Sequence, residues 1–417
     1  MPSPDGPTRI PAISAPDSTL AFLRDGYDFI ATRCDALGTD AFRTRILLRK
    51  VTCVRGPEAV AAFYAPGRMS RRGAMPVSVM TLLQDRGSVQ TLDGEAHRRR
   101  KALFLDLMTP ERLEAARAIL AEELARAAAE EWRGRKEVVL SDAIGGIMCR
   151  TALRWCDLPL EGEDIAALAR ELSAMIAGAG RIGPDRLRAG LLRARSERRM
   201  RDRIAAARQG HGGQGWVIDR LIAHRDADGS ALDDAVAAVE LLNILRPVVA
   251  IGRFIVFAVH ARACHTGAAH WLEARGDEAA CRAFGEEVRR VYPFFPVIGG
   301  RVREAFDWRG ERFGEGDWIL LDLYGTCRDG SVWPAPAQFD PERHMRPPPP
   351  GAMVPQGGGD MEEGHRCPGE DLTRALLTEA IGFFLGLDYE VPAQDLQIPH
   401  DRFPPWPRDG MRLGFSR

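Results

Sequence analysis

The chain has 417 residues, and its 57 lysines and arginines almost balance 58 aspartates and glutamates, giving a net charge of −1 at pH 7. This balance excludes a strong overall attraction to nucleic acid or to acidic membranes. A hydrophobic content of 45% is that of a globular protein with a sizeable core. The arginine-rich stretch 181–203 has no interleaved aromatic residues, so it indicates a solvated helical face rather than a nucleic-acid site.

The eight cysteines are scattered and form no CxxC pair, which predicts reduced thiols in a cytoplasmic protein. The N-terminus has neither a basic region nor an apolar region of the kind that a signal peptide needs. Residues 235–261 are long and apolar enough to span a bilayer, but Glu240, Arg246 and Arg253 lie inside the run. A central arginine is costly in lipid, so a buried helix is the better interpretation and no transmembrane segment is expected.

Helical periodicity dominates the chain in sequence order. It predicts helices over 110–132, 163–178, 196–210, 233–263 and 281–294, and a closing helix over 369–387. A further helix capped by Asp93 would carry His97 and Lys101 at positions i and i+4. Strand-like alternation is confined to 43–54 and 300–325. We therefore expect a mainly α fold with a minor β region, made of an N-terminal extension (1–19) and one large domain (20–417).

The middle of the long helix reads "LLNILRPVVAIGRF" and places Arg246 beside Pro247. A stranded buried charge costs on the order of 3–5 kcal/mol, so something anionic should meet Arg246. The planar guanidinium matches a carboxylate, while Pro247 should kink the helix by clashing with the carbonyl of Asn243. The alternative is an arginine whose charged end reaches solvent at the kink.

Cys367 in "GHRCPGEDLTRALL" stands at the start of the closing helix, with Pro368 and Gly369 expected in the first turn. The free N–H groups of a helix start can donate to a sulfur and hold it as a thiolate. The glycine-rich loop 356–360 would let the backbone approach a flat cofactor. The alternative is a buried structural cysteine beside an ordinary turn.

Upstream, Glu287 and Arg290 in "EVRR" lie on one helix face, and "FDPERH" with Arg343 follows. From about residue 20 to the C-terminus, this order of ExxR, PER and a cysteine loop resembles the cytochrome P-450 superfamily. The resemblance implies a single-domain haem-thiolate fold, with Cys367 as the axial ligand to the iron of haem b.

The resemblance also implies a structural cluster of Glu287, Arg290 and Arg343. It further implies four residues that face the haem propionates, namely His97, Lys101, Arg71 and His365. Without the other motifs, His97 would equally suit an ordinary surface helix.

The sequence departs from the common pattern of that superfamily in two places. Asp360 stands where most members have Phe, and the long helix lacks the usual acid–Thr pair, which argues against NAD(P)H-driven oxygen activation. Five segments are similar to the bacterial fatty-acid peroxygenases, including "QTLDGEAHRRRKALFLDLMTP", "EVRRVYPFFPVIGG" and "PQGGGDMEEGHRCPGE". This resemblance implies hydrogen peroxide as oxidant, a long-chain fatty acid as substrate and no dedicated redox partner.

By this resemblance, Arg246 holds the substrate carboxylate, which acts as acid and base in O–O cleavage, and Pro247 opens space beside it. Hydroxylation is expected at the α and/or β carbon, and Gln90 stands where hydroxylating relatives commonly carry Gln. Leu83, Phe294 and Val297 are expected to line the channel for the fatty-acid tail. Three alternatives remain, namely a decarboxylase that makes terminal alkenes, a reductase-dependent monooxygenase, and a non-catalytic haem sensor or fatty-acid carrier.

Overall fold

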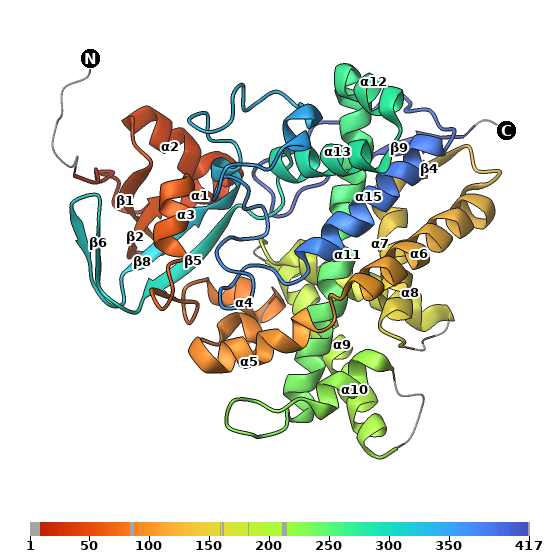
Figure 1. The fold of residues 1–417 in the computed structure, drawn as a ribbon, viewed down its shortest axis with the longest axis horizontal. Helices are drawn as coiled ribbons and strands as arrows, with labels where there is room; N and C mark the ends of the chain where they lie inside the picture. The colour runs from red at the N-terminus through yellow and green to blue at the C-terminus, as the bar shows by residue number, and fades with distance from the viewer. Residues whose placement is uncertain are drawn as a thin grey trace.

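The structure is a computed structural model and describes residues 9–83, 87–158, 160, 162–181, 183–210 and 215–415. It has a helix-rich part and a smaller part built on a sheet (Figure 1). The helix-rich part contains α4 (Val77–Leu83), α5 (Gly94–Leu105), α6 (Pro110–Arg126), α7 (Leu140–Trp155), α8 (Gly162–Gly178), α9 (Pro184–Arg208), α10 (Trp216–Ala223), α11 (Asp234–Cys264), α12 (Thr266–Arg275), α13 (Glu278–Val291) and α15 (Glu370–Gly386). The mainly α fold with minor β structure is confirmed.

The main sheet has five strands in the order β1-β2-β8-β5-β3. They are β1 (Ala41–Ile46), β2 (Arg49–Val54), β8 (Trp318–Asp322), β5 (Val297–Val302) and β3 (Met69–Ser70), with α1 (Thr19–Asp25), α2 (Phe29–Leu37) and α3 (Pro57–Phe63) nearby (Figure 1). Two small antiparallel pairs join β4 (Glu137–Val139) to β9 (Arg412–Gly414) and β6 (Phe306–Trp308) to β7 (Glu311–Phe313). The expected strand region 43–54 is thus a hairpin, and 300–325 divides into several strands and the short helix α14 (Leu323–Thr326).

Most of the predicted helices are confirmed, with shifted ends. The helix expected over 196–210 is the second half of α9, which begins twelve residues earlier at Pro184. Proline fits the first helical turn, and the arginine-rich stretch continues the helix from there. The helix expected over 110–132 ends as a π-helical segment, Ala127–Trp132.

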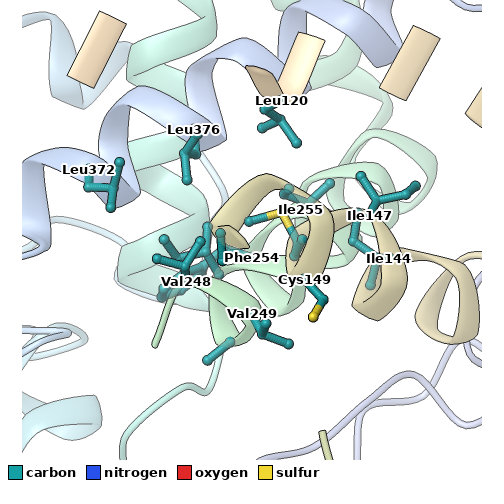
Figure 2. Close-up of a cluster of buried hydrophobic side chains, with 14 of the residues drawn as sticks. Leu120, Ile144, Ile147, Cys149, Val248, Val249, Phe254, Ile255, Leu372 and Leu376 are labelled. Carbon is teal, nitrogen blue, oxygen red and sulfur yellow. The ribbon is translucent and has the colours of Figure 1, made fainter. Parts of the chain in front are cut away.

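The long helix α11 runs through the centre of the molecule (Figure 1). Its apolar side chains meet those of α6, α7 and α15, among them Leu120, Ile147, Val248 and Leu376 (Figure 2). Among the described residues, α11 is the one helix long and apolar enough to cross a membrane, but 94% of that stretch is buried inside the protein. Its hydrophobicity therefore serves the core.

The expected N-terminal extension lies partly outside the described residues, since 1–8 are not described. The part that is described follows the edge strand β1. The amide of Ile13 donates to the carbonyl of Arg43, and the amide of Ser18 donates to the carbonyl of Arg45. This segment therefore ends in backbone contact with the sheet.

Candidate active site

Cys367 lies just before α15. The helix begins at Glu370 with Gly369 as its N-cap, so Pro368 and Gly369 precede the helix instead of forming its first turn as expected. The backbone N–H of Gly369 donates to the sulfur, and the side-chain amide Nε2 of Gln356 lies 3.8 Å from it. Burial raises the pKa of the Cys367 thiol, although the Gly369 N–H and the charges of Lys101 and Arg289 oppose it. The helix start therefore does not produce a thiolate unaided, whereas a bound metal cation would.

The other cysteines offer no comparable position. All eight are free thiols, and Cys34, Cys53, Cys149, Cys156, Cys281 and Cys327 are buried. Burial raises the pKa of Cys34, Cys149 and Cys327 to about 12. These six thiols lie in the core and are inert, and Cys264 is exposed at the end of α11. Cys367 differs from them because it is partly exposed and lies at the start of a helix, so it is the candidate ligand.

The glycine loop that precedes Cys367 is tightly packed against protein. A Cβ added at Gly359, where φ is +82°, would lie 2.8 Å from the Cβ of Tyr64. A Cβ added at Gly358 would lie 2.9 Å from Val354. These two glycines therefore allow a close approach to the end of α3 and to the loop itself, and the expected approach to a flat cofactor stays a prediction.

Four basic side chains gather around the cysteine loop. The rings of His97 and His365 lie 3.9 Å apart, centroid to centroid. The ammonium of Lys101 donates to the carbonyls of Gly364 and, at 2.8 Å, Arg366. The guanidinium of Arg71 donates to the carbonyl of Gly299 at 2.7 Å. In the part of the chain that the structure describes, no carboxylate lies within 4.0 Å of any of the four.

At neutral pH Lys101 and Arg71 carry charge without a carboxylate in contact, whereas His97 and His365 are neutral. Burial lowers the pKa of Lys101 to about 8 and that of His97 to about 4, and it also lowers the pKa of Arg71 and His365. A buried base with a lowered pKa gains most from an anionic partner. The donor set therefore fits a group that brings carboxylates beside Cys367, as the propionates of haem do.

One detail of the helix that carries His97 differs from expectation. Asp93 stands at the N-cap position of α5, but its side chain caps nothing. Its Oδ2 accepts from the hydroxyl of Ser70 at 2.7 Å, which ties α5 to β3. The turn is made instead with Gly94, whose φ of +60° suits glycine.

The central helix presents an open position to this region. Every residue of α11 from Glu240 to Ala261 is buried except Pro247, which is exposed. An exposed side chain halfway along a core helix faces unfilled space. The helix α11 packs against α15, the helix that follows Cys367. The exposed apolar surface of Pro247 therefore fits a flat apolar group such as a haem.

Arg246, beside that proline, is 4% exposed. Its Nη2 donates to the side-chain oxygen of Asn243 at 2.8 Å and to the carbonyl of Leu83. Its Nη1 is buried with no hydrogen-bond partner. Burial and the charge of Arg193 lower the pKa of Arg246 to about 9, so it keeps its charge at neutral pH. The guanidinium thus stays inside the protein, and its charged end does not reach solvent.

A buried polar network fixes this arginine in place. The side-chain amide of Asn243 donates to Glu240 at 2.9 Å and to the side-chain oxygen of Gln90 at 3.2 Å. Glu240 in turn accepts from Arg100 of α5 at 2.6 Å. Arg100 lies next to Lys101, so the network links the arginine of α11 to the helix that carries the basic cluster. Sequence reasoning found Gln90 and Arg246 but missed the three residues that join them to α5.

The three expected tail-channel residues come from different parts of the chain and make different contacts. The carbonyl of Leu83 is beside Arg246, and the ring of Phe294 stacks on Phe254 of α11 at 4.3 Å. Val297 instead packs on the other side of the sheet, in a core cluster with Phe29 and Trp318. Val297 thus contributes to the core between the sheet and α2, and its expected place in the tail channel stays a prediction.

The acid–arginine cluster behind the site forms as the sequence indicated. Glu287 and Arg290 are both fully buried and joined at 2.6 Å, and Arg343 lies 3.3 Å from Glu287. His344, which sequence reasoning missed, adds a contact of 2.8 Å. Burial would raise the pKa of Glu287, but hydrogen bonds from Arg290 and His344 hold it at about 2. A second network, also missed, joins Arg289 to Glu370 at 2.7 Å at the start of α15.

The chain is similar to known haem enzymes. No protein-family model matches the chain. Curated relatives match over short stretches. Geissoschizine oxidase of Alstonia scholaris is 38% identical over 64 residues, 15% of this chain and 13% of its own length. A probable cytochrome P450 513C1 of Dictyostelium discoideum is 29% identical over 131 residues, 31% of this chain and 25% of its own length. The chain thus covers only a small part of these curated relatives.

Solved structures match almost end to end. Cytochrome P450SP alpha (CYP152B1) is 39% identical with a TM-score of 0.92, covering 96% of this chain and 98% of that one. Cytochrome P450EX alpha (CYP152N1), solved with myristic acid, is 35% identical with a TM-score of 0.92, covering 97% and 98%. A variant of cytochrome P450 OleT in complex with arachidonic acid is 29% identical with a TM-score of 0.93, covering 98% and 99%. The chain belongs to the CYP152 family of cytochromes P450, haem-thiolate oxidoreductases.

Proposed function

We propose that this protein uses hydrogen peroxide to hydroxylate a long-chain fatty acid at the α and/or β carbon, and that Arg246 binds the substrate carboxylate. The single observation that carries the proposal is the buried Nη1 of Arg246, which has no hydrogen-bond partner. Two of the solved relatives were determined with fatty acids, myristic and arachidonic. A fatty-acid carboxylate would supply the anion that this arginine lacks.

The hydrogen-bond pattern indicates how the carboxylate would be held. A guanidinium has five N–H groups, two of them on Nη2, and those two are used by Asn243 and Leu83. The N–H groups of Nη1 are therefore available to the substrate, and we propose that they bind one carboxylate oxygen and leave the other free. Anchoring the acid at this end places its first carbons, rather than its tail, nearest to the oxidant.

The free carboxylate oxygen takes the role that an acid–Thr pair has in other haem enzymes. The helix α11 has no Ser or Thr, and Glu240 is held by Arg100, Asn243 and the amide of Val89 at 2.6–2.9 Å. The carboxylate accepts a proton from peroxide and returns it to the oxygen that leaves as water. When bound to Cys367 and the basic cluster, a thiolate-ligated haem supplies the O–O cleavage and the oxidising chemistry. The net reaction turns C–H and H₂O₂ into C–OH and H₂O.

The test is to incubate the haem-loaded protein with a long-chain fatty acid and peroxide and to identify the products. We expect 2- and 3-hydroxy acids, and about 100-fold lower turnover for Arg246→Ala with an unchanged haem spectrum. An Arg246→Lys variant is the matched control, because it keeps the charge but loses the fixed geometry, and it should fall between the two.

Other results would contradict the proposal. Turnover that needs NAD(P)H and a reductase would show a conventional monooxygenase, and terminal alkenes as the main product would show a decarboxylase. Binding of fatty acid without any product would show a carrier or sensor. Full peroxide-driven activity of Arg246→Ala would overturn the role of the arginine.

A further inference from the structure

The hairpin that joins β1 to β2 has an unusual turn. Ile46 pairs with Arg49, so Leu47 and Leu48 form a two-residue loop. Both leucines have left-handed backbone angles, with φ of 52° and 60°. Such a turn normally carries Asn-Gly, because a left-handed conformation is unfavourable for residues with a bulky side chain. Two consecutive leucines here are not explained by the needs of the fold.

The turn also exposes its apolar side chains. Leu47 is 51% exposed and Leu48 is 75% exposed. A third leucine lies close by, because the amide of Leu47 donates to the hydroxyl of Thr19 at 2.6 Å. The next residue, Leu20, is 82% exposed, the highest value among the large hydrophobic residues in the described chain. We call Leu20, Leu47 and Leu48 the leucine tip.

Positive charge surrounds the leucine tip. Arg45, Arg49 and Lys50 flank the turn and are all exposed. In the part of the chain that the structure describes, none of the three has a carboxylate within 4.0 Å. Asp17 is a nearby acid whose carboxylate accepts from the amides of Leu48 and Thr19 and attracts Arg45, so the excess positive charge comes from Arg49 and Lys50. The pKa of Arg301 on β5 is lowered by burial and by the charge of Arg49, which is consistent with a local positive potential.

These features match a lipid surface better than a protein partner. Three leucines cover far less area than the roughly 800 Å² per partner that a stable protein interface needs. A bilayer needs only a few side chains that reach its hydrocarbon, with basic residues at the level of the headgroups. The tip is the turn of the β1–β2 hairpin, at the side of the sheet where β1 is the edge strand and the N-terminal segment is hydrogen-bonded along it.

We propose that the leucine tip docks this protein onto the surface of anionic phospholipid membranes, with the leucines inserted and Arg45, Arg49 and Lys50 at the headgroup phosphates. The inference does not depend on the proposed reaction. It would, however, place the enzyme where long-chain acyl compounds partition.

The experiment is co-sedimentation of the haem-loaded protein with vesicles of phosphatidylcholine alone or mixed with phosphatidylglycerol. We expect binding to the mixed vesicles that weakens as salt is added, because the headgroup attraction is screened. The double variant Leu47→Asn with Leu48→Gly should lose at least about tenfold in binding. This variant should also fold as well as the parent, since Asn-Gly is the sequence that the turn favours.

Two further variants identify the source of binding. Arg49→Gln with Lys50→Gln should remove most of the salt dependence and the preference for phosphatidylglycerol. Leu187→Asn with Leu191→Asn removes another exposed leucine pair among arginines, on α9, and should leave binding unchanged. The proposal would be overturned if the parent protein stayed in the supernatant or if the tip variant bound as well as the parent. It would also be overturned by tip-dependent dimers in solution without vesicle binding.

Discussion

Asn243 determines which nitrogen of Arg246 is free. Its side-chain oxygen accepts from Nη2, and its side-chain nitrogen donates to Glu240 and Gln90, so its orientation is fixed from both ends. If the carboxylate of the substrate binds at Nη1, the neutrality of Asn243 matters. An acid at this position would form an internal ion pair with Arg246 and compete with the substrate.

We therefore predict that Asn243→Asp binds long-chain fatty acid at least roughly tenfold more weakly, a loss of about 1.4 kcal/mol. The measurement is the fatty-acid-induced shift of the haem absorbance in the loaded protein. Asn243→Leu is the control, because it removes the amide without adding charge and should have the smaller effect. Equal affinities of Asn243→Asp and the parent would contradict the arrangement.

At the scale of the element, α11 is one helix of 31 residues that continues through Pro247. The expected kink does not interrupt the helix, since packing along its whole length compensates for one missing backbone hydrogen bond. Pro247 is the exposed position of an otherwise buried stretch, so little packing against other protein side chains is lost if it is replaced. Its presence is explained better by the surface it gives the site than by stability.

Pro247→Ala should therefore raise the free energy of unfolding, by up to about 3 kcal/mol, because alanine restores the donor to the helix interior. Peroxide-driven turnover should fall at the same time, as expected when a residue serves function at the expense of stability. Thermal unfolding of the haem-loaded protein and product yield, measured on the same preparation, check both parts. A variant that is less stable than the parent would show that proline packs there for structural reasons.

The ion cluster that joins α13 to the segment Pro341–Met345 should set the acid limit of the fold. The folded pKa of Glu287 is about 2, below its ordinary value of 4.5, so its contribution is present above pH 4.5 and is lost as the pH falls toward 2. Glu287→Gln should be markedly less stable at pH 7 and should lose less stability than the parent on acidification. Denaturant unfolding at a series of pH values measures this, and parallel curves for the two proteins would contradict it.

At the scale of the whole molecule, the carboxyl group of Asp322 makes stability depend on pH in the direction opposite to that of Glu287. Burial raises the pKa of Asp322 to about 7 from an ordinary 3.8, although the amide of Gly325 donates to its Oδ1 at 2.7 Å. Its Oδ2 is buried without a partner. Because the folded state binds the proton more tightly than the unfolded state, stability is present below pH 3.8 and is lost as the pH rises through 7.

Asp322→Asn should consequently raise the melting temperature at pH 8 and change it little at pH 4. The asparagine keeps the acceptor for Gly325, and its amide carries no charge to bury. Together the two carboxylates predict a stability maximum in the mildly acidic range, bounded by Glu287 below and Asp322 above. A melting temperature of Asp322→Asn that is lower than that of the parent at pH 8 would contradict this account.

The sequence determined most of the helices, the cysteine at a helix start and the order of the ion-cluster residues. It also showed that Arg246 and Pro247 are unfavourable residues in the middle of a buried apolar helix. These features are local, or they follow from the cost of a buried charge, and both can be recognised from residue type and spacing. Only the tertiary structure decided which groups meet. It joined Gln90, Asn243, Glu240 and Arg100, which lie up to 153 residues apart, into one support for Arg246. It also placed Val297 in a core cluster with Phe29 and Trp318, and two strained leucines at the tip of an edge hairpin. Periodicity shows which residues share a face, but the partner of a buried polar atom is chosen by the packing of distant segments.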